Sequence, residues 1–227
     1  MTNTKNKTYL LLSILLSSIL MCVVDSIIKP VYLVKSIIKV CLFLLVPLVY
    51  FLFNKTNLKE LKEIFHIKKK EFIISLGLGI LVFSFILGGY FLLKDVIDFS
   101  GITDNLTKDS GITKDNFLYV ALYISFINSL LEEFFFRGYA FLNLKTVISK
   151  KYAYIISALL FSIYHVGMTS EMFNPVLFIL SLIGLFIGGL IFNFLNDKCG
   201  NIYCSWIVHA FANFGINTIG LILFGII

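Results

Sequence analysis

Polar and ionisable side chains within long apolar segments are the first feature of this sequence that indicates chemistry. A charge at the centre of a bilayer costs at least about 2.5–3.5 kcal/mol on insertion scales, so such residues are candidates for function. A carboxylate can act as a general base, a histidine can assist the proton transfer, and an amide can donate a hydrogen bond to an oxyanion. The candidates come from three apolar segments and are Glu132, Glu133, Arg137, His165, His209 and Asn213.

Helical spacing gives the two adjacent glutamates different partners. Glu133 precedes Arg137 by four residues, which is the favoured order and spacing for an ion pair on one helix. Glu132 points about 100° away from Glu133, and no basic residue nearby in the sequence shares its face. Its face carries a polar stripe formed by Ser125, Asn128 and Ser129. We therefore predict that Glu132 is the general base and that Arg137 neutralises Glu133.

The three segments place their ionisable groups at one depth. At about 1.5 Å per residue, Glu132, His165 and His209 lie roughly 16–21 Å from the lysines of the adjacent loops. His209 and Asn213 are four residues apart and share a helical face. A single histidine in a span more often packs or forms a hydrogen bond, and a Glu–Arg pair near a helix end is often an interfacial anchor. The matched depth favours one hydrated pocket instead.

The composition defines the elements that must position these residues. Of 227 residues, 59% are apolar and 14% are charged, against about 45–50% and about 25% in soluble domains. Soluble, disordered and disulfide-scaffold classes are excluded on this ground. We predict an all-α polytopic membrane helix bundle with about seven transmembrane helices. Residues 1–227 form a single integral membrane domain, with a catalytic core at approximately 116–225.

Seven apolar segments and the lysines between them give a topology. Lysine-rich loops at 54–71 and 143–151 are predicted to be cytoplasmic and the aspartate-rich 94–115 loop external, which makes the N-terminus cytoplasmic. The net charge of +6 is explained by these loops, so we expect no nucleic-acid partner. Three lysines on the outer side are predicted to snorkel to the headgroups: Lys29, Lys35 and Lys39. The predicted spans are 8–28, 31–53, 72–93, 116–142, 152–168, 175–195 and 202–225.

Two shorter features complete the predictions. Leu58, Leu61 and Phe65 fall on one face of a short helix that would lie in the inner interface. Cys199 and Cys204 flank a tight loop, but no second Cys or His pair completes a metal site, and we expect no disulfide.

Three spaced motifs resemble the signatures of the CPBP family of intramembrane proteases (CAAX proteases and bacteriocin-processing enzymes, also called the Abi family). Its Glu-Glu-x-x-x-Arg motif is matched at residues 132–137, its Phe-x-x-x-His motif at Phe161 and His165, and its His-x-x-x-Asn motif at His209 and Asn213. Each motif is weak alone, but the three in this order are fairly specific. The resemblance covers the C-terminal half of the chain.

The resemblance implies an intramembrane endopeptidase. In such enzymes Glu132 would activate water with help from His165, His209 and Asn213 would bind the oxyanion, and Glu133 with Arg137 would hold the site. Zinc is possible, with Glu132, His165 and His209 as ligands, because these residue types suit an open zinc site. We expect no obligatory cofactor, since the glutamate-and-water mechanism of the family needs no resting metal.

The expected partners are a peptide or lipidated protein substrate and the membrane lipids, with the oligomeric state undetermined. Abundant Lys, Asn, Ile and Phe with one Arg resemble an AT-rich bacterial genome, which favours a bacterial plasma membrane. Bacteriocin processing, signal-peptide processing and self-immunity are then the expected roles. The alternatives are a non-catalytic membrane immunity or regulatory protein that binds a partner, and a small transporter, which would need repeated spans or broken helices.

Overall fold

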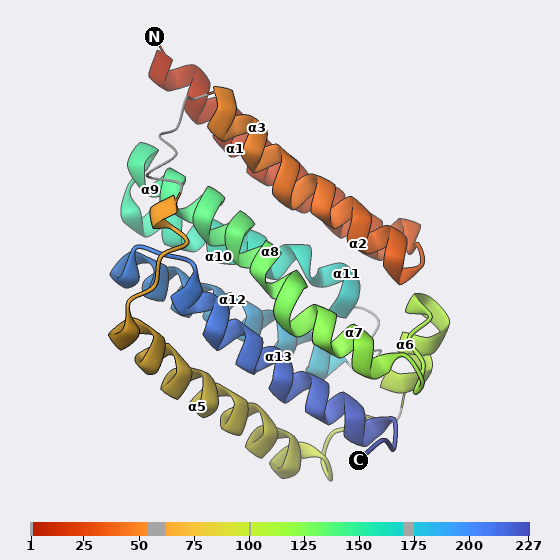
Figure 1. The fold of residues 1–227 in the computed structure, drawn as a ribbon. Helices are drawn as coiled ribbons and strands as arrows, with labels where there is room; N and C mark the ends of the chain where they lie inside the picture. Colours follow the sequence, from red (N-terminus) through yellow and green to blue (C-terminus); the bar gives the residue numbers. More distant parts are fainter. Residues whose placement is uncertain (1, 54–61, 100, 170–174) are drawn as a thin grey trace.

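The computed structural model describes residues 2–53, 62–99, 101–169 and 175–227, and these residues form helices without any β-strand (Figure 1). Six of the helical segments are long and apolar enough to cross a membrane, so the chain is an integral membrane protein. They span Lys7–Ile28, Tyr32–Phe53, Lys69–Leu93, Phe117–Val147, Pro175–Cys199 and Tyr203–Leu223.

The fifth of the seven predicted spans is shorter than expected. The apolar segment at 152–168 forms α10 (Lys150–Tyr164), which has 15 residues, and a short helix α11 (Val166–Thr169). A helix of this length rises about 22 Å, less than the roughly 30 Å of a hydrocarbon core. The helix ends because His165 closes a tighter turn, in which its backbone N–H donates to the carbonyl of Ser162 at 3.1 Å.

The N-terminal third forms a pair of long helices that lie side by side in Figure 1. The first comprises α1 (Thr2–Val23) and a π-helical turn at Val24–Ile28. The second comprises α2 (Tyr32–Val40), a π-helical turn at Cys41–Leu45 and α3 (Val46–Phe53). Tyr9 and Tyr50 stack between them with ring centroids 6.0 Å apart.

The helix that carries the two glutamates is interrupted twice by π-helical segments. It runs through α7 (Phe117–Tyr123), a π segment at Ile124–Asn128, α8 (Ser129–Glu133), a π segment at Phe134–Phe141 and α9 (Leu142–Val147). Insertions of this kind are frequent at functional sites because they change the direction in which side chains point. The glutamates thus occupy a single α-helical turn between two irregular ones.

The remaining long helices are α5 (Lys69–Leu93), α12 (Pro175–Cys199) and α13 (Tyr203–Leu223). A short helix, α6 (Ile102–Ser110), lies in the predicted external loop. α5 packs along α13 in Figure 1, and Gly79 makes this approach possible. A Cβ atom at Gly79 would lie 2.8 Å from the ring of Phe211.

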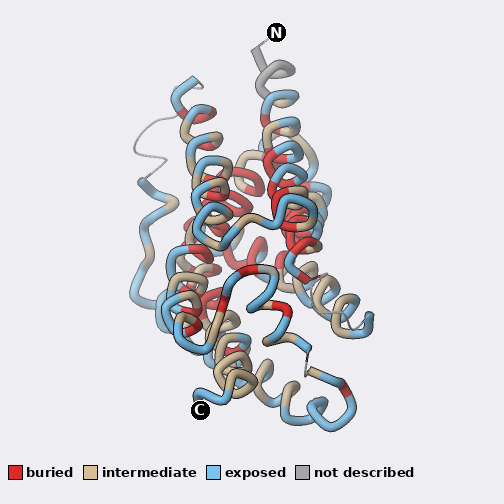
Figure 2. The backbone as a smooth tube through the Cα atoms, turned by 90° about the vertical axis from the view of Figure 1, so that its right-hand side faces the viewer, coloured by how far each residue is buried: buried red, intermediate tan, exposed pale blue. Residues whose placement is uncertain are grey.

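The buried residues lie in the interior of the bundle and the exposed ones on its outward faces (Figure 2). Fully buried aromatic side chains form the interior, and the outward faces carry large apolar side chains such as Phe53, Phe85 and Leu92, each at least 80% exposed. Such faces suit hydrocarbon rather than water. The aromatic residues that are at most 2% exposed are Phe43, Phe135, Phe136, Tyr139, Phe141, Phe161 and Tyr164.

Three predictions made from the sequence need correction or fall outside the described residues. Lys35 and Lys39 do not snorkel outward: Lys35 pairs with Asp25 at 3.1 Å, and Lys39 contacts Glu132 at 3.4 Å. Cys199 and Cys204 form a disulfide, because the loop between α12 and α13 folds back on itself. Leu58 and Leu61 of the predicted interfacial helix lie outside the described residues.

Candidate active site

The structure brings the predicted residues into the interior from three helical regions. Glu132 and Glu133 lie on α8, His165 directly follows α10, and His209 and Asn213 lie on α13. Asn213 is half-buried and donates a hydrogen bond to the carbonyl of Ile124 at 3.3 Å. The five other predicted residues, each at most 6% exposed, are Glu132, Glu133, Arg137, His165 and His209.

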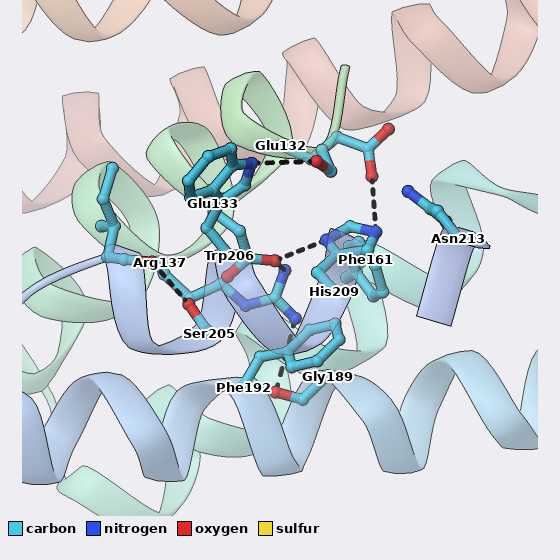
Figure 3. Close-up of polar contacts among 12 residues, drawn as sticks. Glu132, Glu133, Arg137, Phe161, Gly189, Phe192, Ser205, Trp206, His209 and Asn213 are labelled. Atoms are coloured by element: carbon cyan, nitrogen blue, oxygen red, sulfur yellow. Dashed lines mark hydrogen bonds and ion pairs between the residues drawn. The ribbon is translucent and has the colours of Figure 1, made fainter. Parts of the chain in front are cut away.

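His209 connects the two glutamates (Figure 3). Its Nδ1 lies 2.9 Å from Glu133 Oε1, and its Nε2 lies 3.7 Å from Glu132 Oε2. A carboxylate can only accept a hydrogen bond, so Nδ1 carries the proton that binds Glu133. In the neutral imidazole, Nε2 is then the acceptor nitrogen, and it faces Glu132.

Arg137 forms the pair with Glu133 that the spacing predicts, at 3.2 Å between Nη1 and Oε1. The guanidinium is fully buried and lies over the rings of Phe161 and Phe192, at 4.2 and 4.9 Å from their centroids. Its Nη2 also donates to the carbonyl of Gly189 at 3.5 Å. Aromatic faces therefore supply part of the stabilisation that water would give to this charge.

His165 presents the same nitrogen to the site as His209. Its Nδ1 lies 2.7 Å from the carbonyl oxygen of Phe161, which can only accept, so Nδ1 is the protonated nitrogen. Its Nε2 lies 3.8 Å from Glu132 Oε2. Two acceptor nitrogens thus face one carboxylate oxygen at distances that suit a bridging water better than a direct hydrogen bond.

The two oxygens of Glu132 have different surroundings. Oε1 accepts from Asn128 Nδ2 at 2.5 Å, from the hydroxyl of Tyr164, and from Lys39 Nζ at 3.4 Å. Oε2 is buried and has no hydrogen-bond partner among the described residues. Since buried carboxylate oxygens are normally hydrogen-bonded, Oε2 of Glu132 is available for a reactant.

Sequence reasoning missed two residues that contact Glu132. Lys39 comes from the second apolar span and Tyr164 immediately precedes His165. The rule that intramembrane ionisable residues are functional candidates applied equally to Lys39. The predicted topology puts Lys39 on the outer side of the membrane, and the prediction that it snorkels to the headgroups concealed its contact with Glu132.

Comparison with protein families gives one match. Residues 114–215 match the family model described as Rce1-like, type II CAAX prenyl endopeptidase Rce1-like. Residues 114–215 are therefore similar to the Rce1-like family, and we call them the Rce1-like region. The Rce1-like region, a little under half of the chain, contains Glu132, Glu133, Arg137, His165, His209 and Asn213. Comparisons with curated proteins and with solved structures give no match.

The Rce1-like region has a donor set that fits zinc in residue type. Glu132 Oε2 faces the Nε2 atoms of His165 and His209, and each Nδ1 is held by an oxygen acceptor, as is usual for histidines that bind zinc. Within the described residues, however, the three potential ligand atoms that lie within 4.8 Å of one another belong to Glu71, Cys199 and Cys204, and the two cysteines are joined in a disulfide. Glu132, His165 and His209 would have to move closer together to hold an ion. A bound ion would polarise a carbonyl group of the substrate.

Proposed function

We propose that this protein is an intramembrane endopeptidase in which Glu132 activates water to hydrolyse a peptide bond. The Rce1-like family match supports an endopeptidase that works in the membrane. The observation that carries the mechanism is the unpartnered Oε2 of Glu132, which lies 3.7–3.8 Å from two imidazole nitrogens. A water molecule between these atoms would donate one hydrogen to Oε2 and the other to Nε2 of His165.

The reaction then follows from these contacts. Oε2 takes a proton from the water, the water oxygen attacks the carbonyl carbon, and the carbonyl electron pair moves to its oxygen. The tetrahedral intermediate collapses as the C–N bond breaks, and Glu132 returns the proton to the leaving nitrogen. A base in this position contributes about 10²–10⁴-fold to the rate.

The proposed oxyanion donors are His209 and Asn213. His209 donates from Nε2 when it carries both protons, and Glu133, 2.9 Å from Nδ1, compensates the resulting charge. Asn213 uses one N–H of its amide for Ile124, so the other can serve the oxyanion. Donors fixed in a site with little water contribute about 3–4 kcal/mol each.

The proposed substrate is a membrane-associated or lipidated protein or peptide, such as a bacteriocin or signalling precursor in a bacterial plasma membrane. The large exposed apolar side chains of the outer helices support a site within the membrane, where such a substrate would be found. We propose that zinc is not required. Glu132, His165 and His209 would hold it if it is.

The test is cleavage of a panel of transmembrane and lipidated peptides by the purified full-length protein. Glu132→Gln is expected to abolish cleavage, because the amide cannot take the proton from water. Glu71→Gln, at the edge of the bundle, is the control and should retain activity. Equal cleavage by the wild type and Glu132→Gln would refute the proposal. Loss of activity with a chelator, restored by zinc, would show that the metal is required.

A further inference from the structure

A lysine from the N-terminal helices reaches the proposed base. Lys39, near the C-terminal end of α2, has a buried side chain whose ammonium group lies within 3.4 Å of three polar atoms. These are Asn128 Oδ1 at 2.8 Å, Tyr164 Oη at 3.1 Å and Glu132 Oε1 at 3.4 Å. Residue 39 lies outside the Rce1-like region at 114–215, so the family's motifs do not include it.

The direction of these hydrogen bonds is fixed by the chemistry of the ammonium group. A lysine ammonium can only donate, so Asn128 Oδ1 and Tyr164 Oη must accept from it. The Tyr164 hydroxyl has a single proton, which is then directed to Glu132 Oε1. The Asn128 amide is oriented in the same way, with Nδ2 toward Oε1. One cation therefore sets the polarity of both neutral donors to Glu132.

We infer that Lys39 is a positioning residue for Glu132, which anchors Oε1 and leaves Oε2 to the reacting water. This inference rests on the proposed function, since it assigns a role within the same site. Lys39 also supplies a positive charge opposite a carboxylate that is 1% exposed. The N-terminal helix pair thus completes the active site of the Rce1-like region.

The same helix provides a matched control. Lys35, one turn before Lys39, is also held in an ion pair, with Asp25 Oδ1 at 3.1 Å. Its side chain is 11% exposed, as is that of Lys39. The change from lysine to methionine is therefore chemically identical at the two positions, and at residue 39 alone it removes a partner of Glu132.

The first experiment compares the kinetics of Lys39→Met and Lys35→Met in the full-length protein. Lys39→Met is expected to lower kcat by about 10- to 100-fold, part of the roughly 10²–10⁴-fold that a positioned base contributes, with KM changed by less than about 2-fold. Lys35→Met should keep kcat near the wild-type value. A kcat for Lys39→Met equal to that of Lys35→Met would overturn the inference. Activity in Glu132→Gln would instead refute the proposed function.

The second experiment measures whether Lys39 acts through Glu132. The melting temperatures of wild type, Lys39→Met, Glu132→Gln and the double variant form a cycle that needs no activity. The loss caused by Lys39→Met should shrink by at least half in the Glu132→Gln background, because the carboxylate is already removed. Additive losses would overturn the inference. If Lys39→Met does not fold, recovery of folding in the double variant supports it, and failure of both overturns it.

Discussion

Replacing Arg137 with methionine removes the cation that faces Glu133 in the interior of the bundle. Both side chains are 0% exposed, and their charged atoms lie 3.2 Å apart. After the substitution, Glu133 keeps the Nδ1–H of His209 as a partner but loses its opposite charge. Breaking a buried pair from one side costs about 3–5 kcal/mol, because the remaining charge stays buried without compensation. We expect Arg137→Met to destabilise the fold by this amount.

The measurement is unfolding of the purified protein in mixed detergent micelles, with Lys145→Met as the matched control. Lys145 pairs with Asp197 at the same distance of 3.2 Å, but its side chain is 30% exposed. Such a partly hydrated pair contributes about 0–1 kcal/mol. The double variant Arg137→Met, Glu133→Gln should recover at least half of the loss, since both charges are then absent. A loss of unfolding free energy below about 1 kcal/mol for Arg137→Met would refute the reasoning. Equal losses for Arg137→Met and Lys145→Met would refute it as well.

Three other predictions concern the oxyanion, the helix packing and the topology. Asn213→Ala is expected to lower kcat by about 10²–10³-fold with little change in KM, as removal of an oxyanion donor does, and an unchanged kcat would exclude that role. Gly79→Val should lower the melting temperature of the bundle because a Cβ would lie 2.8 Å from Phe211. Gly88→Val is the control and should be tolerated, because nothing lies within 4 Å of a Cβ there. Equal melting temperatures of the two variants would argue against the close contact of α5 and α13. A cysteine introduced at Lys108 should react with an impermeant maleimide in intact cells and one at Lys150 should not, and the reverse pattern would invert the proposed topology.

The sequence predicted most of the local geometry of the site. A spacing of four residues placed Glu133 against Arg137, and the 100° turn between neighbours separated Glu132 from that pair, as the structure shows. Helical periodicity is sufficient for these relations because they depend on one helix. The common depth of Glu132, His165 and His209 was also predictable, because rise per residue is constant. In the structure, Nε2 of each histidine lies within 3.8 Å of Glu132 Oε2.

Relations between distant segments were not predictable in the same way. Lys39 contacts Glu132 across 93 positions of the chain, and a count of residues from the loops cannot show which way a lysine side chain turns. The disulfide between Cys199 and Cys204 depends on the fold of a short loop, which helical periodicity does not predict. The short length of α10 was missed because apolar composition continues beyond Tyr164, where the helix ends.

The two adjacent glutamates are kept distinct because each has its own cation. Lys39 faces Glu132 and Arg137 faces Glu133, so the four charges balance in pairs rather than competing for one proton. Like charges close together in a poorly hydrated interior would otherwise force one carboxylate to become neutral. Arg137 comes from the same helix as its partner, whereas Lys39 comes from the N-terminal helix pair. In each glutamate, Oε2 has no hydrogen-bond partner among the described residues. Among the described residues, only that of Glu132 faces two imidazole nitrogens, and this difference supports the proposal that Glu132 is the base and that Glu133 has a structural role.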